Sequence, residues 1–377
     1  MAEATPVSGC ERVMLFIESG GPGGAESVVL RLALALRERD FDTSVMTTRT
    51  GWLTETLRDR GIPHVKVEAG GRLDPGFPRR IAAVLRERRI DVLHTHLLDS
   101  NVYGGIAARL AGVRHVATEH GDVHHTRAKK LLRTKVRLMS LLGARMTAVS
   151  QFTADHLARL GANRGRITRV GNPIDAPSPI DDAERKELRA SLGIDAAVGD
   201  HWLWAHVANL RPVKDQPTLL RGFAKALVGS PIPQSLCLLG DGKSRADLEA
   251  LCGQLGVRDR VHFLGFRNDV PKWLQAADGF AMSSRSEAMP MSLLEASLSG
   301  CLPVCTNVGG IGEVVRPGET GFLVERGDAD ALGRAMHAAV ADIATSRSMA
   351  TQVRHEVATE FSVPTILDAY YALYRSP

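Results

Sequence analysis

Short strand-like runs alternate with longer amphipathic segments along most of the chain. Residues 13–17 form a continuous apolar run with the length of a buried strand. From Ala25 onward, apolar residues recur three and four positions apart, as on one face of a helix. This alternation predicts an α/β fold in which helices cover both faces of parallel sheets. We expect strands at 13–17, 44–47, 64–67, 91–96, 114–118, 145–150, 166–170, 203–208, 235–239, 261–264 and 279–282.

A break in composition near the middle of the chain predicts two domains. At 377 residues the chain is long for one core, and about two domains are expected. Residues 171–175 lead into the proline-rich segment 176–179, which has the composition of a linker. The last segment carries aliphatic and tyrosine residues at helical spacing. We therefore expect domains at 1–175 and 176–360, followed by a C-terminal helix within 361–377.

Residues 284–300 combine the end of a strand, a tight loop and the start of a helix. Pro290 suits the first turn of a helix, because its missing N–H would have no partner there. The free backbone amides and the positive end of such a helix form an anion site. Glu287 precedes this site and Glu295 follows it, about 12 Å away if the intervening residues are helical. Two carboxylates so placed suit an elongated ligand with phosphates in its middle, such as a nucleotide sugar.

This segment resembles the Glu-x7-Glu signature of the retaining glycosyltransferases of family 4, or glycosyl transferases group 1. The resemblance implies the GT-B fold, with two Rossmann-like domains whose parallel sheets face across a cleft. It also implies that Glu287 holds hydroxyls of the donor sugar and that Glu295 holds the ribose. The family usually has glycine after the first glutamate, whereas this chain has Ala288, which would be strained at a positive φ. The helix start that would face the diphosphate comprises Met289, Pro290 and Met291.

Three elements of the first half also resemble the family. The sequence Gly-Gly-Ala-Glu, beginning with Gly23 and Gly24, is similar to a Gly-Gly-x-Glu loop that approaches the donor phosphates and the acceptor. Its spacing is not that of the dinucleotide fingerprint, which argues against a nicotinamide enzyme. His120 follows the strand at 114–118, at the functional edge of a parallel sheet. The resemblance places His120 near the reacting carbon of the donor, and Asn172 where the interdomain cleft begins.

Loops of the second half complete the resemblance. Arg211 and Lys214 match an arginine and a lysine that neutralise the donor diphosphate, and fixed cations there would stabilise the leaving group. Asp215 stands where glycine is common in the family. Gly240 lies in another tight loop after a strand, and Phe266 lies where relatives seat the base. The resemblance also implies that the helix within 361–377 crosses back to the N-terminal domain.

The resemblance implies transfer of a sugar from a nucleoside diphosphate donor to an acceptor hydroxyl, with retention at the anomeric carbon. We favour a UDP-sugar as donor and, as one acceptor, a lipid-linked glycan of polysaccharide synthesis. The chain shows no clear nucleophile for a glycosyl-enzyme, so we favour front-face displacement, with domain closure excluding water. Two alternatives remain open: a nucleotide-sugar 2-epimerase of the same architecture, and a catalytically silent nucleotide-sugar-binding subunit.

Charge along the chain points to one further partner. The net charge of +5 is mild and does not select between phosphate and anionic lipid. Residues 123–154 contain no acidic side chain, and 124–145 has the pattern of a basic amphipathic helix. Such a helix can lie on an anionic membrane surface, although it can also dock on its own domain with a solvated basic face. No nucleic-acid module is recognised, so we expect no nucleic-acid partner.

Cysteine and histidine patterns predict neither a disulfide framework nor a metal site. The five cysteines lack metal-ligand spacing, and we expect Cys237 and Cys305 to pack as small hydrophobic residues. His94 and His96 share a strand face without an identified third ligand. We therefore expect no metal and no cofactor beyond the nucleotide sugar. No signal-peptide pattern is apparent at the start, which favours a cytoplasmic protein, peripheral at the inner face of the membrane if the basic helix binds lipid.

Overall fold

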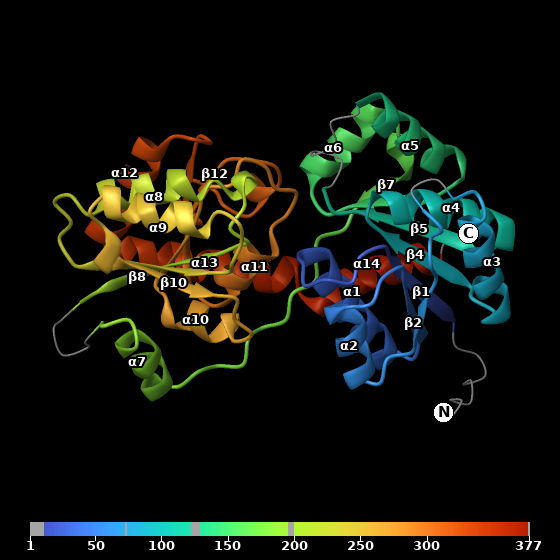
Figure 1. Cartoon of the computed structure of the whole chain (residues 1–377), viewed down its shortest axis with the longest axis horizontal. Coiled ribbons are helices and arrows are strands. Elements are labelled where there is room, and N and C mark those ends of the chain that lie inside the picture. Colours follow the sequence, from blue (N-terminus) through green and yellow to red (C-terminus); the bar gives the residue numbers. More distant parts are fainter. Residues whose placement is uncertain (1–10, 72–73, 122–128, 195–199, 376–377) are drawn as a thin grey trace. The chain divides into compact units, whose positions relative to one another are not determined.

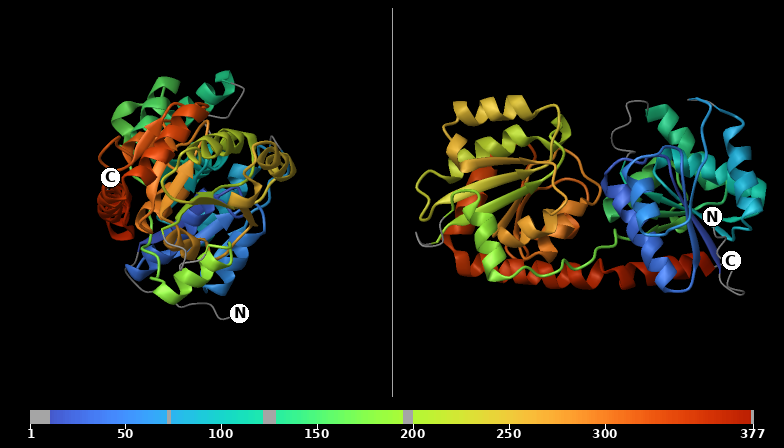
Figure 2. Two further views of the ribbon diagram at one scale, coloured as in Figure 1. Left: turned by 90° about the vertical axis from the view of Figure 1, so that its left-hand side faces the viewer. Right: turned by 60° about the horizontal axis from the view of Figure 1, so that its bottom comes forward.

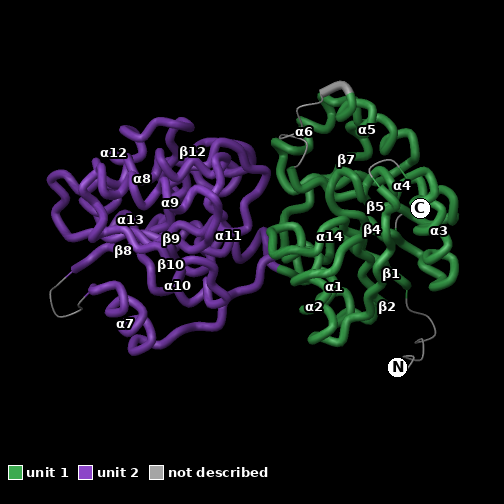
Figure 3. Tube along the Cα trace, in the orientation of Figure 1, with its two compact units in different colours: residues 1–173, 363–377 green, residues 174–362 purple. Residues whose placement is uncertain are grey.

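The computed structural model describes residues 11–71, 74–121, 129–194 and 200–375. The chain forms two compact units, coloured separately in Figure 3. Unit 1 comprises Met1–Pro173 with Val363–Pro377, and unit 2 comprises Ile174–Ser362. Each unit has its own parallel sheet with helices on both faces, which confirms the predicted α/β architecture of two Rossmann-like domains.

The sheet of unit 1 has seven parallel strands in the order β3-β2-β1-β4-β5-β6-β7. Its strands are β1 (Arg12–Ile17), β2 (Asp42–Thr47), β3 (His64–Lys66), β4 (Val92–His96), β5 (Arg114–Glu119), β6 (Arg145–Ala148) and β7 (Ile167–Arg169). Its helices are α1 (Gly24–Glu38), α2 (Trp52–Asp59), α3 (Phe77–Glu87), α4 (Leu98–Ala111), α5 (Lys129–Leu141), α6 (Gln151–Leu160) and α14 (Val363–Arg375). Helices α3 to α6 cover one face, and α1, α2 and α14 lie on the other (Figure 1).

The sheet of unit 2 has six parallel strands in the order β10-β9-β8-β11-β12-β13. Its strands are β8 (Trp202–Val207), β9 (Gln234–Leu239), β10 (Val261–Gly265), β11 (Gly279–Met282), β12 (Leu302–Thr306) and β13 (Phe322–Val324). Its helices are α7 (Asp182–Ala190), α8 (Gln216–Ala226), α9 (Arg245–Gln254), α10 (Val270–Ala276), α11 (Met291–Leu298), α12 (Ala329–Ala341) and α13 (Ile343–Glu360). Helices α8, α9 and α12 lie on one face and α10, α11 and α13 on the other (Figure 2).

The central strands are buried because their apolar runs are covered on both faces. Every residue from Val13 to Ile17 in β1 has no exposed surface, and the same holds for Phe280 and Ala281 in β11. Cys237 and Cys305 are also fully buried and unbonded, which confirms that they pack as small hydrophobic residues. No helix in the described part of the chain is long and apolar enough to cross a membrane.

Three expected details differ in the structure. Helix α11 begins at Met291, so Pro290 is its N-cap and not a residue of its first turn. Strand β6 ends at Ala148, because the Ser150 hydroxyl accepts a hydrogen bond from the Thr153 amide and caps α6. The basic helix ends earlier than expected: α5 spans Lys129–Leu141 and does not continue to 145, and residues 122–128 lie outside the described part of the chain.

Candidate functional site

The order of strands in unit 2 brings two predicted site residues together. The chain moves outward from β8 in one direction and from β11 in the other, so the loops after these neighbouring strands flank a topological switch point. The first loop carries Lys214 in a short 3₁₀ turn, and the second carries Glu287 before α11. Lys214 Nζ lies 2.5 Å from Glu287 Oε1, and the two side chains are 24% and 10% exposed. A largely buried ion pair therefore marks the carboxyl edge of this sheet.

Backbone and side-chain hydrogen bonds hold the two loops against each other. The Arg285 amide donates to the Val213 carbonyl at 2.8 Å, and the Ser283 hydroxyl donates to the Asp215 carbonyl at 2.9 Å. On the far side, the Thr306 hydroxyl after β12 donates to the Ser284 carbonyl at 2.7 Å. The loop that carries Glu287 is thus fixed from both neighbouring strands.

The loop after β12 also supports the backbone of Glu287 and Ala288. The Gly310 amide donates to the Ala288 carbonyl at 2.9 Å. Gly309 has φ of +61°, and a Cβ built on it would lie 1.6 Å from the Glu287 carbonyl oxygen. Only glycine therefore fits at this close approach. No local pattern indicates this contact, because Gly309 is 22 residues away from Glu287 in the chain.

Ala288 is unstrained in this loop. Its φ is not positive, and its side chain is only 7% exposed. The strain that alanine would have at a positive φ is therefore absent. Met289 and Pro290 are buried directly after it, and Met291 begins α11. The first amides of α11 have no partner within the helix, so its start presents free donors at the same edge of the sheet.

The remaining predicted residues of unit 2 lie along this edge. Gly240 follows β9 with φ of +130°, and a Cβ there would lie 2.1 Å from the Ala208 carbonyl oxygen in the loop after β8. Phe266 follows β10 and is 61% exposed. Arg211 is exposed at the start of the 3₁₀ turn and forms no side-chain hydrogen bond or ion pair with the described residues. Glu295 lies in the second turn of α11 and is partly exposed. Lys214 therefore contacts Glu287, whereas the side chain of Arg211 contacts neither of them through a hydrogen bond or an ion pair.

Asp215 occupies the position after Lys214 where relatives usually have glycine. Its backbone is left-handed, with φ of 49° and ψ of 41°, which is a conformation that favours glycine. Its carboxylate is 4% exposed and lies 3.1 Å from Arg285 Nε. Arg285, which no sequence motif singles out, thus links the loop that carries Glu287 to the carboxylate of Asp215 in the loop after β8.

We expect Asp215→Ala to be less stable than Asp215→Gly. Both variants lose the ion pair with Arg285, but only alanine keeps a Cβ in the left-handed conformation, at about 1–2 kcal/mol. Urea unfolding of the two variants measures this difference. Equal midpoints would show that the backbone strain at this residue is negligible.

In unit 1 the predicted residues also follow the carboxyl ends of strands. Gly23 caps α1 after β1, and a Cβ on it would lie 2.3 Å from the Glu26 carboxylate. That carboxylate accepts a hydrogen bond from the Ser19 hydroxyl and so closes the glycine loop, with Gly24 exposed at the helix start. His120 follows β5 directly and is partly exposed. Asn172 follows β7 and is buried.

His94 and His96 each form hydrogen bonds with neighbouring side chains. His94 lies 2.6 Å from the Tyr374 hydroxyl and 2.7 Å from the Thr118 hydroxyl. His96 Nδ1 lies 2.9 Å from His120 Nε2. Burial lowers the pKa of His120 to about 4, and it lowers the pKa values of His94 and His96 well below the usual range. Among the described residues, no three histidine, cysteine or carboxylate groups are arranged to hold a metal.

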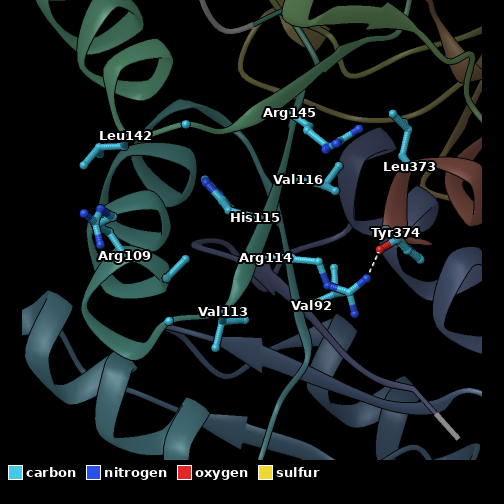
Figure 4. Close-up of a pocket in the computed structure, with 13 residues that line it drawn as sticks. Val92, Arg109, Val113, Arg114, His115, Val116, Leu142, Arg145, Leu373 and Tyr374 are labelled. Carbon is cyan, nitrogen blue, oxygen red and sulfur yellow. Dashed lines mark hydrogen bonds between the residues drawn. The ribbon is translucent and has the colours of Figure 1, made fainter. Parts of the chain in front are cut away.

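A separate cavity lies at the opposite edge of the same sheet (Figure 4). Its volume is about 220 Å³, and it opens where β4, β5 and β6 begin. The Arg114 guanidinium donates to the Tyr374 carbonyl at its wall, so α14 closes one side. Because ligands of open α/β sheets bind at carboxyl ends of strands, this cavity is apart from the candidate site.

Comparison with known proteins identifies the family. The model of Glycosyltransferase Family 4 matches residues 22–177, and that of Glycosyl transferases group 1 matches residues 186–356. The Escherichia coli UDP-Gal:alpha-D-GlcNAc-diphosphoundecaprenol alpha-1,3-galactosyltransferase is 26% identical over 365 residues, which cover 93% of each chain. The Bacillus anthracis N-acetyl-alpha-D-glucosaminyl L-malate synthase is 27% identical, covering 80% of this chain and 78% of the relative.

Solved structures agree with this family. The crystal structure of Anabaena HepE in complex with UDP superposes with a TM-score of 0.83 at 25% identity, covering 96% of this chain and 99% of HepE. The lipopolysaccharide glycosyltransferase WaaG shares the fold, with a TM-score of 0.73 at 17% identity, covering 97% of this chain and all of WaaG. The chain therefore belongs to the family 4 glycosyltransferases, also described as glycosyl transferases group 1.

Proposed function

We propose that the protein is a retaining glycosyltransferase that moves a sugar from a nucleoside diphosphate, with UDP favoured, to an acceptor hydroxyl. The contact between Lys214 and Glu287 carries this proposal. It places a cation and a hydroxyl-binding carboxylate beside the free amides at the start of α11, as a charged diphosphate joined to a sugar requires. The galactosyltransferase relative is named for a UDP-sugar, and HepE has been crystallised with UDP and with UDP-glucose.

The residues at the edge of unit 2 would divide the donor among them. Glu287 accepts hydrogen bonds from hydroxyls of the sugar, and Glu295 accepts them from the ribose. Lys214 neutralises the diphosphate together with the start of α11, and Arg211 is free to turn toward it. Gly240 lets the loop after β9 pack against the Ala208 carbonyl, and its amide donates to the Gly265 carbonyl next to Phe266, whose exposed ring seats the base.

Unit 1 would contribute the other side of the reaction. Gly23 and Gly24 allow the donor phosphates and the acceptor to approach the start of α1 closely, because they carry no side chain. His120 contacts the donor sugar near the reacting carbon. Asn172, which is buried after β7, is assigned to donor binding by its match to the family motif.

The reaction would proceed by front-face displacement. The bond between the anomeric carbon and the phosphate oxygen breaks, and a bond from the acceptor oxygen forms on the same face. The departing phosphate oxygen takes the acceptor proton, so no protein nucleophile is required. Lys214 and the α11 amides stabilise the charge that grows on the departing nucleoside diphosphate, so this scheme requires no metal.

A thermal-shift screen followed by a transfer assay tests the function. Purified protein is heated with a panel of UDP-, GDP-, ADP- and dTDP-sugars. A donor at about 100 times its Kd should stabilise unit 2 by about 2.7 kcal/mol, which raises Tm by several degrees. The stabilising donor is then incubated with glycan, lipid-linked glycan and small hydroxyl acceptors. Interconversion of donor sugars without an acceptor would indicate an epimerase, and binding without turnover would indicate a silent subunit.

A lipid-linked acceptor would bring the protein to an anionic membrane, and α5 offers the surface. The apolar side of α5 packs against its own unit, because Leu132, Val136 and Met139 are buried in the core of unit 1. Leu131 and Leu141 remain 55% and 84% exposed, next to exposed arginines. We propose that these exposed residues make the peripheral contact.

Reversing one charge of α5 tests the membrane contact. Arg133→Glu should weaken cosedimentation with phosphatidylglycerol vesicles about tenfold, because each basic residue near such a surface is worth about 1 kcal/mol. Arg347→Glu, an exposed position on α13, is the matched control. Equal binding by both variants, or no binding by the unaltered protein, would leave α5 as a docked helix with a solvated basic face.

A further inference from the structure

His96 lies between two other imidazole rings at the carboxyl end of β4. Its ring centroid is 4.2 Å from that of His94 and 5.2 Å from that of His120, and the planes of His96 and His120 differ by 25°. His96 has no exposed surface, whereas His120 is partly exposed beyond it. The only hydrogen bond of the His120 ring within the described residues is the 2.9 Å contact of its Nε2 with His96 Nδ1. His96 therefore determines how the His120 ring is turned.

The base of this stack is itself fixed. The Tyr374 hydroxyl has His94 Nδ1 as its hydrogen-bond partner in the described structure, so its proton must be donated to that nitrogen. His94 then carries its own proton on Nε2 and donates it to the Thr118 hydroxyl. Neither nitrogen of His94 is available to His96. The ring of His94 thus supports His96 by stacking alone.

Hydrogen-bond partners also determine the tautomers of His96 and His120. His96 Nε2 is buried and has no hydrogen-bond partner in the described structure. If His120 donated to His96 Nδ1, the neutral His96 would carry its proton on Nε2, as a buried N–H without an acceptor. Buried N–H groups without partners are rarer than under-used acceptors. His96 therefore donates from Nδ1 to His120 Nε2, and the proton of His120 resides on Nδ1.

A neutral His120 is compatible with the positive charge that develops on the sugar ring during glycosyl transfer. The transition state develops positive charge on the sugar ring, and an imidazolium beside it would oppose this charge. Burial lowers the pKa values of both rings, so the pair is neutral at pH 7. A neutral His120 with its proton on Nδ1 can still donate a hydrogen bond to a hydroxyl or phosphate oxygen.

We propose that His96 is a positioning residue that orients His120 and holds it as the neutral Nδ1–H tautomer, so that His120 donates a hydrogen bond from Nδ1 to the bound substrate. The hydrogen bond from His120 to substrate rests on the proposed function. Its structural part, the tautomer of His120, stands apart from any substrate and can be measured without one.

The tautomer is read by NMR of protein labelled with ¹⁵N-histidine, with the His120 signals assigned from a His120→Gln variant. Two substitutions of His96 are compared. His96→Asn keeps a side-chain N–H near the position of Nδ1, and His96→Leu removes it. We expect the Nδ1–H pattern for His120 in the unaltered protein and in His96→Asn, and a mixture of tautomers in His96→Leu. The Nε2–H pattern in the unaltered protein, or an unchanged signal in His96→Leu, would overturn the inference.

Kinetics with the donor found in the screen provide the second readout. His96→Leu should lower kcat about 10- to 100-fold with little change in the KM of the donor, and His96→Asn should recover most of the loss. His115→Leu is the matched control, because His115 is a buried histidine of β5 whose Nε2 bonds to the Thr95 hydroxyl and not to His120. If His96→Leu and His115→Leu lose equal activity, the effect is one of packing and the positioning role is refuted. If no transferase activity is found, the NMR result alone decides the tautomer.

Discussion

Replacing Lys214 with methionine is expected to lower the kcat of sugar transfer by about 100- to 1000-fold, the usual effect of removing one fixed donor to a developing anion. Lys214 lies 2.5 Å from Glu287 and is mostly buried, so its charge cannot be replaced by water without rearrangement. The methionine side chain keeps the length of the lysine stem, so the loss reports the charge. Steady-state kinetics with a nucleotide-sugar donor measure it.

The same substitution elsewhere in unit 2 provides the control. Lys225 lies on α8 and pairs with Asp330, and both side chains are more than half exposed. Exposed pairs of this kind contribute about 0–1 kcal/mol, so Lys225→Met should leave kcat unchanged. A kcat for Lys214→Met within threefold of the unaltered protein would contradict the assignment of Lys214 to the leaving group.

Replacing Gly309 with alanine should remove most of the activity, although Gly309 has no side chain that could contact the substrate. The added Cβ would lie 1.6 Å from the Glu287 carbonyl oxygen, so the backbone of Glu287 must move. A displacement of about 1 Å at a substrate-positioning residue can cost about 100-fold in rate. The left-handed conformation of Gly309 adds a loss of about 1–2 kcal/mol in the free energy of unfolding. Kinetics and urea unfolding of one preparation separate the two effects.

Gly318→Ala isolates the conformational part of this loss. Gly318 also has a left-handed backbone, with φ of +77°, but a Cβ on it would meet nothing within 4 Å. We therefore expect Gly318→Ala to lose stability and to retain activity. If Gly309→Ala behaves in the same way as Gly318→Ala, the Glu287 loop tolerates the displacement and its position is not critical.

The pattern of apolar residues predicted most of the scaffold, since the runs that formed strands are short and apolar and alternate with segments of helical periodicity. Because parallel strands place their carboxyl ends at one edge, the order of the elements also indicated where Gly23, His120, Lys214 and Glu287 would lie. These predictions depend on local sequence and on a general property of the fold. The helix at 290–300 was predicted for the same reason, with an error of one residue at its start.

Contacts between residues far apart in the chain could not be predicted. Arg285 reaches Asp215 and Tyr374 reaches His94 across 70 and 280 residues, and nothing in their neighbouring sequence indicates the partner. The conformation of Ala288 could not be predicted either, because the φ of a loop residue depends on the bonds that hold the loop. The same limit applies to the basic helix, because its apolar residues indicate that they are buried, but not whether protein or lipid covers them.

The C-terminal helix α14 limits how this protein can be divided or recombined. Unit 1 is not encoded by one continuous stretch, because Val363–Pro377 belongs to it and Tyr374 supports His94 from there. A fragment that stops after residue 173 would leave the buried places of Tyr370 and Tyr374 empty. A chimaera with new donor preference must therefore replace 174–362 as an insertion with two junctions. A single cut after residue 173 would leave α14 on the fragment that carries unit 2, so unit 1 would lack its last helix.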